Sequence, residues 1–198
     1  MKLPFNKTIY QTIHGQSVTT DTAFIVKTIR DQVIKEELTM LELGSGNGII
    51  SIMLAHYNPK WEIEGIEIQK HLVELSRDNA KLTDTMPVFM EADLREYRPP
   101  EKYDLIVSNP PYFPSRKGRS SPNKERAISR HEITCKMPDV LENIKYNLKK
   151  TGSAFILYPS VRWKDIKIYA KKVDLKPKKK FFLKRENKEK MLLEFMHA

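Results

Sequence analysis

Cysteine is almost absent from this chain of 198 residues, and its single Cys135 cannot form an internal disulfide. No cysteines and histidines are grouped at the spacing of metal ligands, so we expect no metal site. No apolar run approaches the roughly 20 residues that a membrane-spanning helix needs, and the N-terminus lacks the apolar core of a signal peptide. These absences predict a protein of a reducing compartment, the cytoplasm, without membrane contact. They do not determine the oligomeric state, for which a monomer is the simplest expectation.

Acidic residues are outnumbered, because 25 Asp and Glu face 35 Lys and Arg, which gives a formal net charge of +10. The excess is local, since residues 145–190 contain 16 basic and only four acidic residues. A second basic group comes earlier and consists of Arg116, Lys117, Arg119, Lys124, Arg126 and Arg130. Basic surface of this kind attracts phosphate backbones, although it also occurs as a merely solvated face. Charge therefore favours a nucleic-acid partner and leaves the solvated face as the alternative.

The apolar pattern alternates between the periods of strands and helices. Strands are predicted at 40–43, 62–67, 88–90, 103–107 and 154–158, and a terminal hairpin at 181–184 and 191–195. Helices are predicted at 20–33, 49–56, 69–81, 138–149 and 161–172, with Gly152 just past the end of the fourth. This order predicts one α/β domain, with a mostly parallel sheet of seven strands, helices on both faces and an antiparallel hairpin at one edge.

Four parts are expected within this single domain of residues 1–198. Residues 1–37 form an N-terminal segment and helix, and residues 38–112 form the ligand-binding half. A polar loop at 113–136 leads to the C-terminal half, 137–198. Ligands of such sheets bind at the carboxyl ends of the strands, and each motif described below falls at one of these ends.

Glycine is scarce too, yet three of the seven glycines lie together in Glu42-Leu43-Gly44-Ser45-Gly46-Asn47-Gly48. Closely spaced glycines let a backbone turn sharply after a strand and let a ligand approach without interference from Cβ atoms. The spacing G-x-G-x-G differs from the G-x-G-x-x-G of dinucleotide sites, and the Glu42 carboxylate suits a cation better than a pyrophosphate. We therefore expect S-adenosylmethionine rather than NAD, held by Glu42, Gly44, Gly46 and Gly48.

Two further carboxylates end strands on the same side of the sheet. Glu67 ends the second strand, where it can accept hydrogen bonds from both ribose hydroxyls of a cofactor. Asp93 follows the third strand, where it can accept a hydrogen bond from the adenine amino group. Taken alone, Glu67 is more typical of a solvated surface and Asp93 of a turn or helix cap. The preceding glycine loop favours a cofactor-binding role for Glu67, and Asp93 remains open.

The fourth strand runs into Asn109-Pro110-Pro111-Tyr112. Two prolines fix φ and lack N–H donors, so the backbone is stiff and its carbonyls are left free. The Asn109 side-chain oxygen and the Pro110 carbonyl can together hold the two hydrogens of a planar NH2 group. They would thereby stabilise the positive charge that grows on nitrogen during methyl transfer. Tyr112 offers a ring on which a flipped base can stack. A plain Pro-Pro turn is the alternative, and we favour the catalytic interpretation.

The tetrapeptide and the glycine loop together resemble class I amino-methyltransferases, which act on exocyclic amino groups of bases or on glutamine amides. Within that group the chain looks like the bacterial tRNA (adenine-N6)-methyltransferases that modify adenine 37 of a valine tRNA. The closer likeness lies in Ser17-Val18-Thr19-Thr20-Asp21, Gly65-Ile66-Glu67-Ile68-Gln69 and Arg130-His131-Glu132. Thr20 departs from the pattern, because members usually have glycine before the aspartate.

This resemblance implies a Rossmann-like fold and an S-adenosylmethionine site formed by Glu42, Gly44, Gly46, Glu67 and Asp93. It also implies that Asn109 lies between cofactor and base, that Pro110, Pro111 and Tyr112 complete the amine site, and that Asp21 helps to close the pocket. The tRNA backbone would lie against Arg116, Lys117, Arg119, Arg126 and Arg130, and lysines from 171 to 184 would extend this contact.

Several alternatives share parts of this pattern. A glutamine N5-methyltransferase acting on release factors uses the same tetrapeptide, but those proteins resemble a fusion with an N-terminal helical domain. A DNA adenine methyltransferase typically needs a target-recognition region, for which only 113–136 is long enough. An rRNA target also remains open. An inactive cofactor-binding module is disfavoured by the intact Asn109–Tyr112, and a dinucleotide-dependent hydride-transfer enzyme is disfavoured by the glycine spacing.

Overall fold

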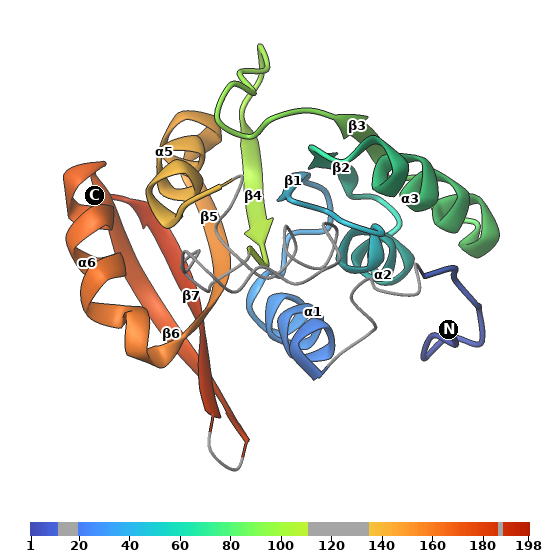
Figure 1. Cartoon of the computed structure of the whole chain (residues 1–198), viewed down its shortest axis with the longest axis horizontal. Coiled ribbons are helices and arrows are strands. Elements are labelled where there is room, and N and C mark those ends of the chain that lie inside the picture. Colours follow the sequence, from blue (N-terminus) through green and yellow to red (C-terminus); the bar gives the residue numbers. More distant parts are fainter. Residues whose placement is uncertain (12–19, 111–134, 186–187) are drawn as a thin grey trace, which may run out of the picture.

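The computed structural model describes residues 1–11, 20–110, 135–185 and 188–198. In these ranges the helices and strands follow one another along the chain (Figure 1). They are α1 (Thr20–Gln32), β1 (Thr39–Leu43), α2 (Ile49–Tyr57), β2 (Glu62–Glu67), α3 (Lys70–Thr83), β3 (Val88–Glu91), β4 (Tyr103–Ser108), α5 (Met137–Asn147), β5 (Leu148–Pro159), the 3-10 turn η1 (Ser160–Arg162), α6 (Trp163–Lys172), β6 (Leu175–Arg185) and β7 (Lys188–His197).

Seven strands form one sheet in the order β3-β2-β1-β4-β5-β7-β6. The first five strands of the chain are parallel to one another, whereas β7 lies antiparallel between β5 and β6. The predicted seven-stranded, mostly parallel sheet with an antiparallel C-terminal hairpin is therefore confirmed. Because β1 to β5 are parallel, their carboxyl ends meet along one side of the sheet, which we call the carboxyl edge, opposite an amino edge.

Two apolar cores hold the helices against the two faces of this sheet. Side chains of α1, α2 and α3 pack with one set of strand residues, and side chains of α5 and α6 pack with the other set. Successive residues of a strand point alternately into the two cores. On β1, Met40 belongs to the first core and Leu41 to the second, and both are fully buried. Glu42 therefore points to the same face as Met40, toward α2, whose Ser51 its carboxylate contacts.

One predicted boundary is wrong. The expected helix 138–149 ends at Asn147, and β5 begins at Leu148 rather than at residue 154. Gly152 lies inside this strand, where an added Cβ would come within 2.8 Å of the Asp104 backbone oxygen. The glycine therefore permits a close approach between β4 and β5 instead of ending a helix. The apolar pattern of the helix continued through Leu148 in the sequence, and that side chain is fully buried in the strand.

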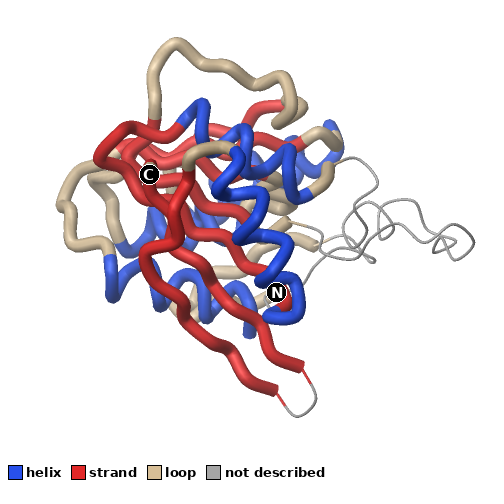
Figure 2. The backbone as a smooth tube through the Cα atoms, turned by 90° about the vertical axis from the view of Figure 1, so that its left-hand side faces the viewer, coloured by secondary structure: helices blue, strands red, loops and turns tan. Residues whose placement is uncertain are grey.

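The terminal hairpin is longer than predicted, because β6 takes in the lysine-rich run 176–180. Pro177 is tolerated there since β6 is an edge strand, and the register with β7 shifts between Pro177 and Lys179. The last residue of β5, Pro159, pairs with Lys190. The tip of the hairpin, between residues 183 and 190, therefore extends past the carboxyl edge. The hairpin projects from the body of the molecule in two perpendicular views (Figures 1 and 2).

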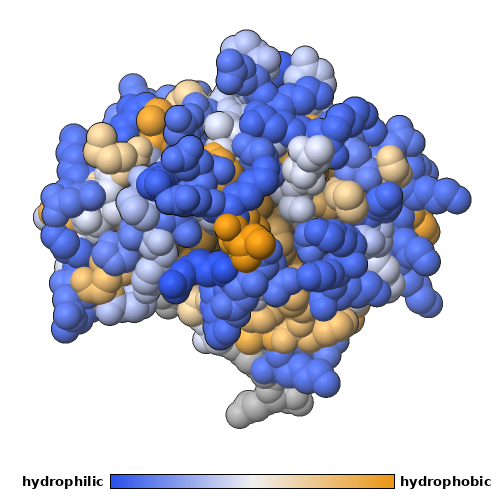
Figure 3. Space-filling model, turned by 180° about the vertical axis from the view of Figure 1, so that it is seen from behind, coloured by the Kyte–Doolittle hydropathy of each residue, from blue (hydrophilic) through white to orange (hydrophobic). Residues whose placement is uncertain are grey.

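The surface seen from behind is mostly hydrophilic, with hydrophobic side chains in limited patches (Figure 3). This pattern fits a chain in which 30% of residues are charged. Among the helices that the structure describes, none combines the length and the apolarity needed to cross a bilayer.

Candidate active site

The glycine loop joins β1 to α2 at the carboxyl edge. The backbone N–H groups of Gly44 and Ser45 donate to the Ile66 carbonyl on β2, at 2.9 and 3.0 Å, which ties the loop to the neighbouring strand. Gly44, Gly46 and Gly48 all have positive φ, at 70°, 55° and 80°, a region that other residues rarely adopt. The loop sequence therefore folds as predicted, with a sharp turn at the end of a buried strand.

The three glycines have different surroundings. An added Cβ at Gly44 or Gly46 would meet no atom of the described residues within 4 Å, so both border space that the described part of the chain leaves open at the carboxyl edge. At Gly48 it would come within 2.7 Å of the Phe89 ring and 2.9 Å of the Ser76 Cβ. Gly48 is thus explained by core packing at the start of α2, whereas Gly44 and Gly46 leave room for a ligand.

Glu42 is buried beneath this loop, with only 2% of the residue exposed. Its Oε2 accepts hydrogen bonds from the Ser51 backbone N–H, at 3.0 Å, and from the Ser51 hydroxyl, at 2.5 Å. Burial, with a smaller contribution from the nearby Glu67, raises the pKa of Glu42 from its ordinary 4.5 to about 8, against the two Ser51 hydrogen bonds that lower it. A cation placed beside Glu42 would therefore favour its ionised form.

Glu67 joins the end of β2 to the glycine loop. Its Oε2 accepts a hydrogen bond from the Gly46 N–H at 3.1 Å, and its Oε1 accepts one from the Gln69 N–H at 3.0 Å. Only 7% of the residue is exposed. A carboxylate predicted to serve as a ribose acceptor thus lies directly against the glycines that border open space.

Asp93 lies close to these groups, because the Ala92 N–H donates to the Glu67 carbonyl at 3.0 Å. Its Oδ1 accepts from the Arg95 backbone N–H, at 2.9 Å, and both carboxylate oxygens bind the Arg95 guanidinium. These hydrogen bonds hold the pKa of Asp93 below its usual range. Asp93 is therefore an ionised turn residue at the carboxyl edge, and its role toward a cofactor adenine stays a prediction.

The end of β4 lies beside the start of the glycine loop. Ser108 pairs with Leu43 across the sheet, and the Ser108 hydroxyl donates to the Leu43 carbonyl at 2.9 Å. The next residue, Asn109, has a buried Oδ1 that finds no hydrogen-bond partner among the described residues. Pro110 is buried as well. The structure thus brings Asn109 and Pro110 together with the glycine loop at the carboxyl edge.

The remaining predicted site residues lie outside the described residues. They are Pro111 and Tyr112 of the tetrapeptide and the basic residues Arg116, Lys117, Arg119, Arg126 and Arg130. Their predicted roles stay predictions.

Asp21 also lies at the carboxyl edge, in the first turn of α1. Its carboxylate forms an ion pair with Lys190 of β7, whose β5 partner is the strand-ending Pro159. The expectation that Asp21 closes the pocket remains a prediction. The ion pair fixes the start of α1 against the hairpin.

Sequence reasoning missed Asn79 on α3, which is fully buried. Its Oδ1 accepts from the Tyr10 N–H at 2.7 Å, and its Nδ2 donates to the carbonyls of Tyr10, at 3.1 Å, and Asn47, at 3.0 Å. Asn79 therefore holds the N-terminal segment and the glycine loop together. The available signal was its place on the buried face of a helix, at helical spacing from Ser76 and Thr83.

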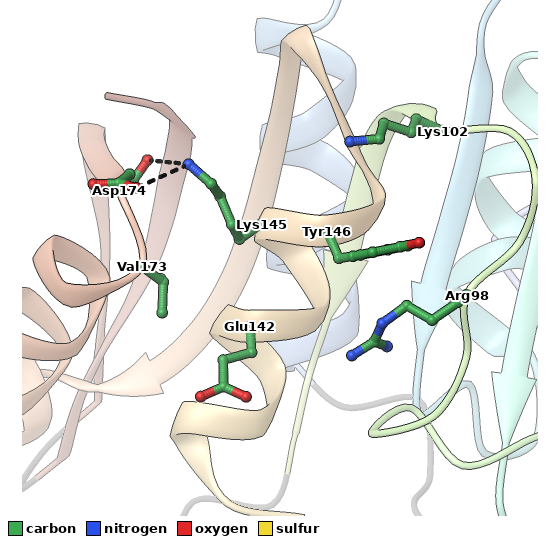
Figure 4. A pocket seen from close by; sticks show the side chains of 7 residues that line it. All are labelled: Arg98, Lys102, Glu142, Lys145, Tyr146, Val173 and Asp174. Carbon is green, nitrogen blue, oxygen red and sulfur yellow. Dashed lines mark hydrogen bonds and ion pairs between the residues drawn. The ribbon is translucent and has the colours of Figure 1, made fainter.

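A cavity of about 390 Å³ lies elsewhere, at the amino edge beside the end of α5. Figure 4 shows Tyr146 with Lys102 and Arg98 on either side of its ring, and Lys145 bonded to Asp174. None of the candidate site residues lines this cavity. It is therefore separate from the carboxyl-edge site.

A family model, the methyltransferase small domain, matches residues 15–130 of this chain. The match spans more than half of the sequence and includes the glycine loop, Glu67 and Asn109-Pro110-Pro111-Tyr112. The chain belongs to this family.

Comparison with individual proteins agrees with this assignment. A tRNA1(Val) (adenine(37)-N6)-methyltransferase of Porphyromonas gingivalis is 31% identical over 137 residues, which cover 66% of this chain and 53% of that protein. A release factor glutamine methyltransferase of Streptococcus pneumoniae is 34% identical over 93 residues, covering 47% of this chain and 33% of that protein. The chain spans about half the length, or less, of the curated relatives it matches.

Solved structures show the same fold. Magnesium protoporphyrin IX methyltransferase from Synechocystis, determined with bound S-adenosylmethionine, superposes with a TM-score of 0.66 over 94% of this chain and 88% of that chain, at 14% identity. The predicted Rossmann-like class I methyltransferase fold is therefore confirmed.

Proposed function

We propose that this protein transfers a methyl group from S-adenosylmethionine to N6 of an adenine in tRNA, at adenine 37 of a valine tRNA. One observation carries the proposal: a buried side-chain oxygen, Asn109 Oδ1, has no partner among the described residues and lies where β4 ends beside the glycine loop. A buried acceptor without a donor is costly in a folded protein, so such an atom is best explained by a ligand that supplies the donor. A tRNA substrate places the protein in the cytoplasm.

The residues around the glycine loop fit S-adenosylmethionine. Gly44 and Gly46 border open space in which a ligand can approach the backbone closely. Glu67 presents a carboxylate to this space for hydroxyl donors, and Glu42 lies beneath the loop as an acid that a cationic ligand would ionise. When bound there, the cofactor supplies a methyl group carried on a positively charged sulfur.

Asn109 and Pro110 then act on the substrate. The lone pair of an exocyclic amine is delocalised into the ring, which makes the nitrogen a poor nucleophile. Two fixed acceptors, the Asn109 side-chain oxygen and the Pro110 carbonyl, hold the two N–H groups and stabilise the positive charge that develops on nitrogen. Because Pro110 has no N–H, its own backbone adds no competing donor. The methylated nitrogen loses its proton readily, so a general base before attack is not required.

The adenine assignment follows the relatives named as tRNA adenine-N6-methyltransferases, supported by the net charge of +10. Bases of an anticodon loop are unpaired, so turning one into a pocket is comparatively easy. In this proposal Tyr112 stacks on the base, and Arg116, Lys117, Arg119, Arg126 and Arg130 bind the phosphate backbone. The second candidate is methylation of a glutamine amide in a protein, which the release factor relative favours.

A substrate survey separates these two candidates. The protein is incubated with radiolabelled S-adenosylmethionine and, in parallel, with unmodified tRNA, rRNA and a release factor. We expect label in tRNA, recovered as N6-methyladenosine after digestion to nucleosides. Label in the release factor alone would overturn the tRNA assignment while leaving the amine chemistry in place, and label in none of them would overturn both.

The Asn109→Ala variant tests the chemistry. We expect methyl transfer to fall at least about a hundredfold, the loss that follows removal of one preorganised hydrogen-bonding group aimed at developing charge in an oxyanion hole, with the affinity for S-adenosylmethionine reduced much less. The variant should be as stable as the parent, because it removes a buried oxygen that has no partner in the described structure.

Asn143→Ala is the matched control. This buried asparagine donates to the Leu94 carbonyl at 2.5 Å, far from the glycine loop along the chain. Its replacement should lower stability and leave methyl transfer intact. Retained activity in Asn109→Ala would refute the proposed role of the corner.

A further inference from the structure

The β6–β7 hairpin presents an exposed aromatic side chain beside the candidate site. Directly paired residues of antiparallel strands point to the same face. Phe182 pairs with Met191 of β7, which pairs with Tyr158 of β5, and the latter two are buried in the core under α5 and α6. Phe182 shares their face but remains 51% exposed, because it lies on the edge strand.

The register of the sheet places Phe182 level with the Asn109–Pro110 corner. Ser108 of β4 pairs with Ile156 of β5, and Tyr158 is two residues further along the same strand. The row from Tyr158 through Met191 to Phe182 therefore runs past the end of β4, at the height of Pro110. Three strand spacings, about 14 Å in total, separate the corner from Phe182.

Two lysines flank Phe182 on this same face. Lys180 and Lys184 lie two residues before and two residues after it, which gives their side chains the same orientation. The Lys180 ammonium lies 3.5 Å from the centre of the Trp163 ring at the start of α6. Neither lysine forms an ion pair with any residue that the structure describes.

The lysines that point to the other face of the hairpin behave differently. Lys178 forms an ion pair with Glu194 at 2.9 Å, and Lys190 forms one with Asp21. The first pair joins the two strands of the hairpin, and the second holds the hairpin to α1. Glu189, directly across from Lys184, is an acidic neighbour on the Phe182 face but makes no ion pair with it.

We propose that Phe182, Lys180 and Lys184 form a single-stranded RNA contact, the hairpin platform, that holds nucleotides next to the one being methylated. An exposed ring with ammonium groups on both sides suits a base stacked on the ring and phosphates bound at the lysines. An RNA strand with one base at Asn109 would reach the platform by continuing along the carboxyl edge. The proposal rests on the proposed function, since it assigns that same site its neighbouring substrate contact.

Two variants, Phe182→Ala and the double change Lys180→Gln/Lys184→Gln, test the platform in the full chain. Binding of a fluorescent tRNA anticodon stem-loop is followed by anisotropy at several salt concentrations. We expect Phe182→Ala to weaken binding about tenfold. The double variant should reduce the slope of log affinity against log salt by about 1.4, the value for two phosphate contacts on a single strand. KM for RNA should rise, with kcat within about twofold.

The amino-edge cavity supplies the matched control. Tyr146 is 49% exposed and has Arg98 and Lys102 near its ring, at 4.7 and 5.7 Å from the ring centre. Tyr146→Ala and Lys102→Gln/Lys145→Gln should leave RNA affinity and salt slope unchanged. An equal loss of RNA affinity in the hairpin variants and in these control variants would overturn the platform, because it would indicate only long-range electrostatic attraction. Glu189→Gln should tighten RNA binding.

Two further outcomes distinguish the platform from a membrane contact and from the proposed function. Unchanged RNA binding in the hairpin variants, together with loss of their binding to anionic lipid vesicles, would assign the surface to a membrane and overturn the proposal. Should the parent protein bind RNA through the hairpin yet label no RNA, the proposed function would fail while the platform stood. Circular dichroism on each variant checks that the fold is retained.

Discussion

The Glu67 carboxylate accepts a hydrogen bond from the backbone N–H of Gly46, 3.1 Å away. This contact joins the end of β2 to the glycine loop, so the acid and the loop are positioned relative to each other before any ligand binds. Its other oxygen is held by the Gln69 N–H at the start of α3. The carboxylate is thus fixed by the backbone on two sides, as a preorganised acceptor should be.

Replacing Glu67 by alanine should weaken S-adenosylmethionine binding by about 2–3 kcal/mol, the cost of losing hydrogen bonds to a charged group. Isothermal titration calorimetry measures this change. Glu62→Ala is the control, because Glu62 begins the same strand at the amino edge and is exposed. Equal affinities for the two variants would contradict the assignment of Glu67 to the cofactor site.

Gly46→Ala and Gly152→Ala should distinguish a glycine that leaves room for a ligand from a glycine that permits close packing of two strands. Alanine at Gly46 costs about 1–2 kcal/mol because φ is +55°, and its Cβ would enter the open space, so S-adenosylmethionine affinity should fall more than tenfold. Alanine at Gly152 should cost about 1–3 kcal/mol by overpacking against the Asp104 backbone oxygen at 2.8 Å. Its cofactor affinity should be unchanged. Thermal denaturation and calorimetry on both variants check the pair.

Most of the fold could be predicted from the sequence because its strands and helices have clear apolar periods. The strand 62–67 was predicted to the residue, and the glycine loop was predicted at the right strand end. The boundary at Leu148 could not be predicted, since a fully buried leucine fits either a helix or a strand. The full length of β6 could not be predicted, because its lysines and Pro177 show no apolar alternation. This run is a strand because it pairs with β7.

The site was predictable only in part. Carboxylates at strand ends could be found from topology, and the structure does bring Glu42, Glu67 and Asn109 to one edge. The hydrogen-bond partners of the site residues could not be predicted. Ser51 donates to Glu42, Arg95 binds Asp93, and Asn79 joins two distant segments. Asp93 and Arg95 are only two residues apart, but the Asn79 contacts with Tyr10 and Asn47 join residues 69 and 32 apart, which no local pattern encodes.

Asn79→Ala should loosen the glycine loop and the N-terminal segment together. It removes one buried and two partly buried hydrogen bonds, and it leaves the Tyr10 N–H and the Asn47 carbonyl without this partner. We expect a loss of about 2–3 kcal/mol in the free energy of unfolding. Hydrogen exchange should become faster at both Tyr10 and residues 44–48. Faster exchange at only one of the two segments would show that Asn79 does not couple them.

The buried Glu42 makes both stability and ligand affinity depend on pH. Its pKa is raised from 4.5 to about 8 in the folded protein, chiefly by burial. Between these values the folded state retains a proton that the unfolded state has lost, so stability falls as pH rises from about 4.5 to about 8. The fall is at most about 1.4 kcal/mol per pH unit. Below pH 4.5 both states are protonated and Glu42 has no effect.

Glu42→Gln should remove this dependence, because the amide stays neutral at every pH. Chemical denaturation at pH 5 and pH 8 should show a smaller loss of stability in the variant than in the parent. Binding of cationic S-adenosylmethionine should respond in the opposite direction: in the parent its affinity rises as Glu42 ionises toward pH 8, whereas in the variant this rise is lost. Glu67→Gln serves as the comparison, because Glu67 is the neighbouring carboxylate that raises the Glu42 pKa. A parent whose cofactor affinity is flat over this range would show that Glu42 does not face the charge of the ligand.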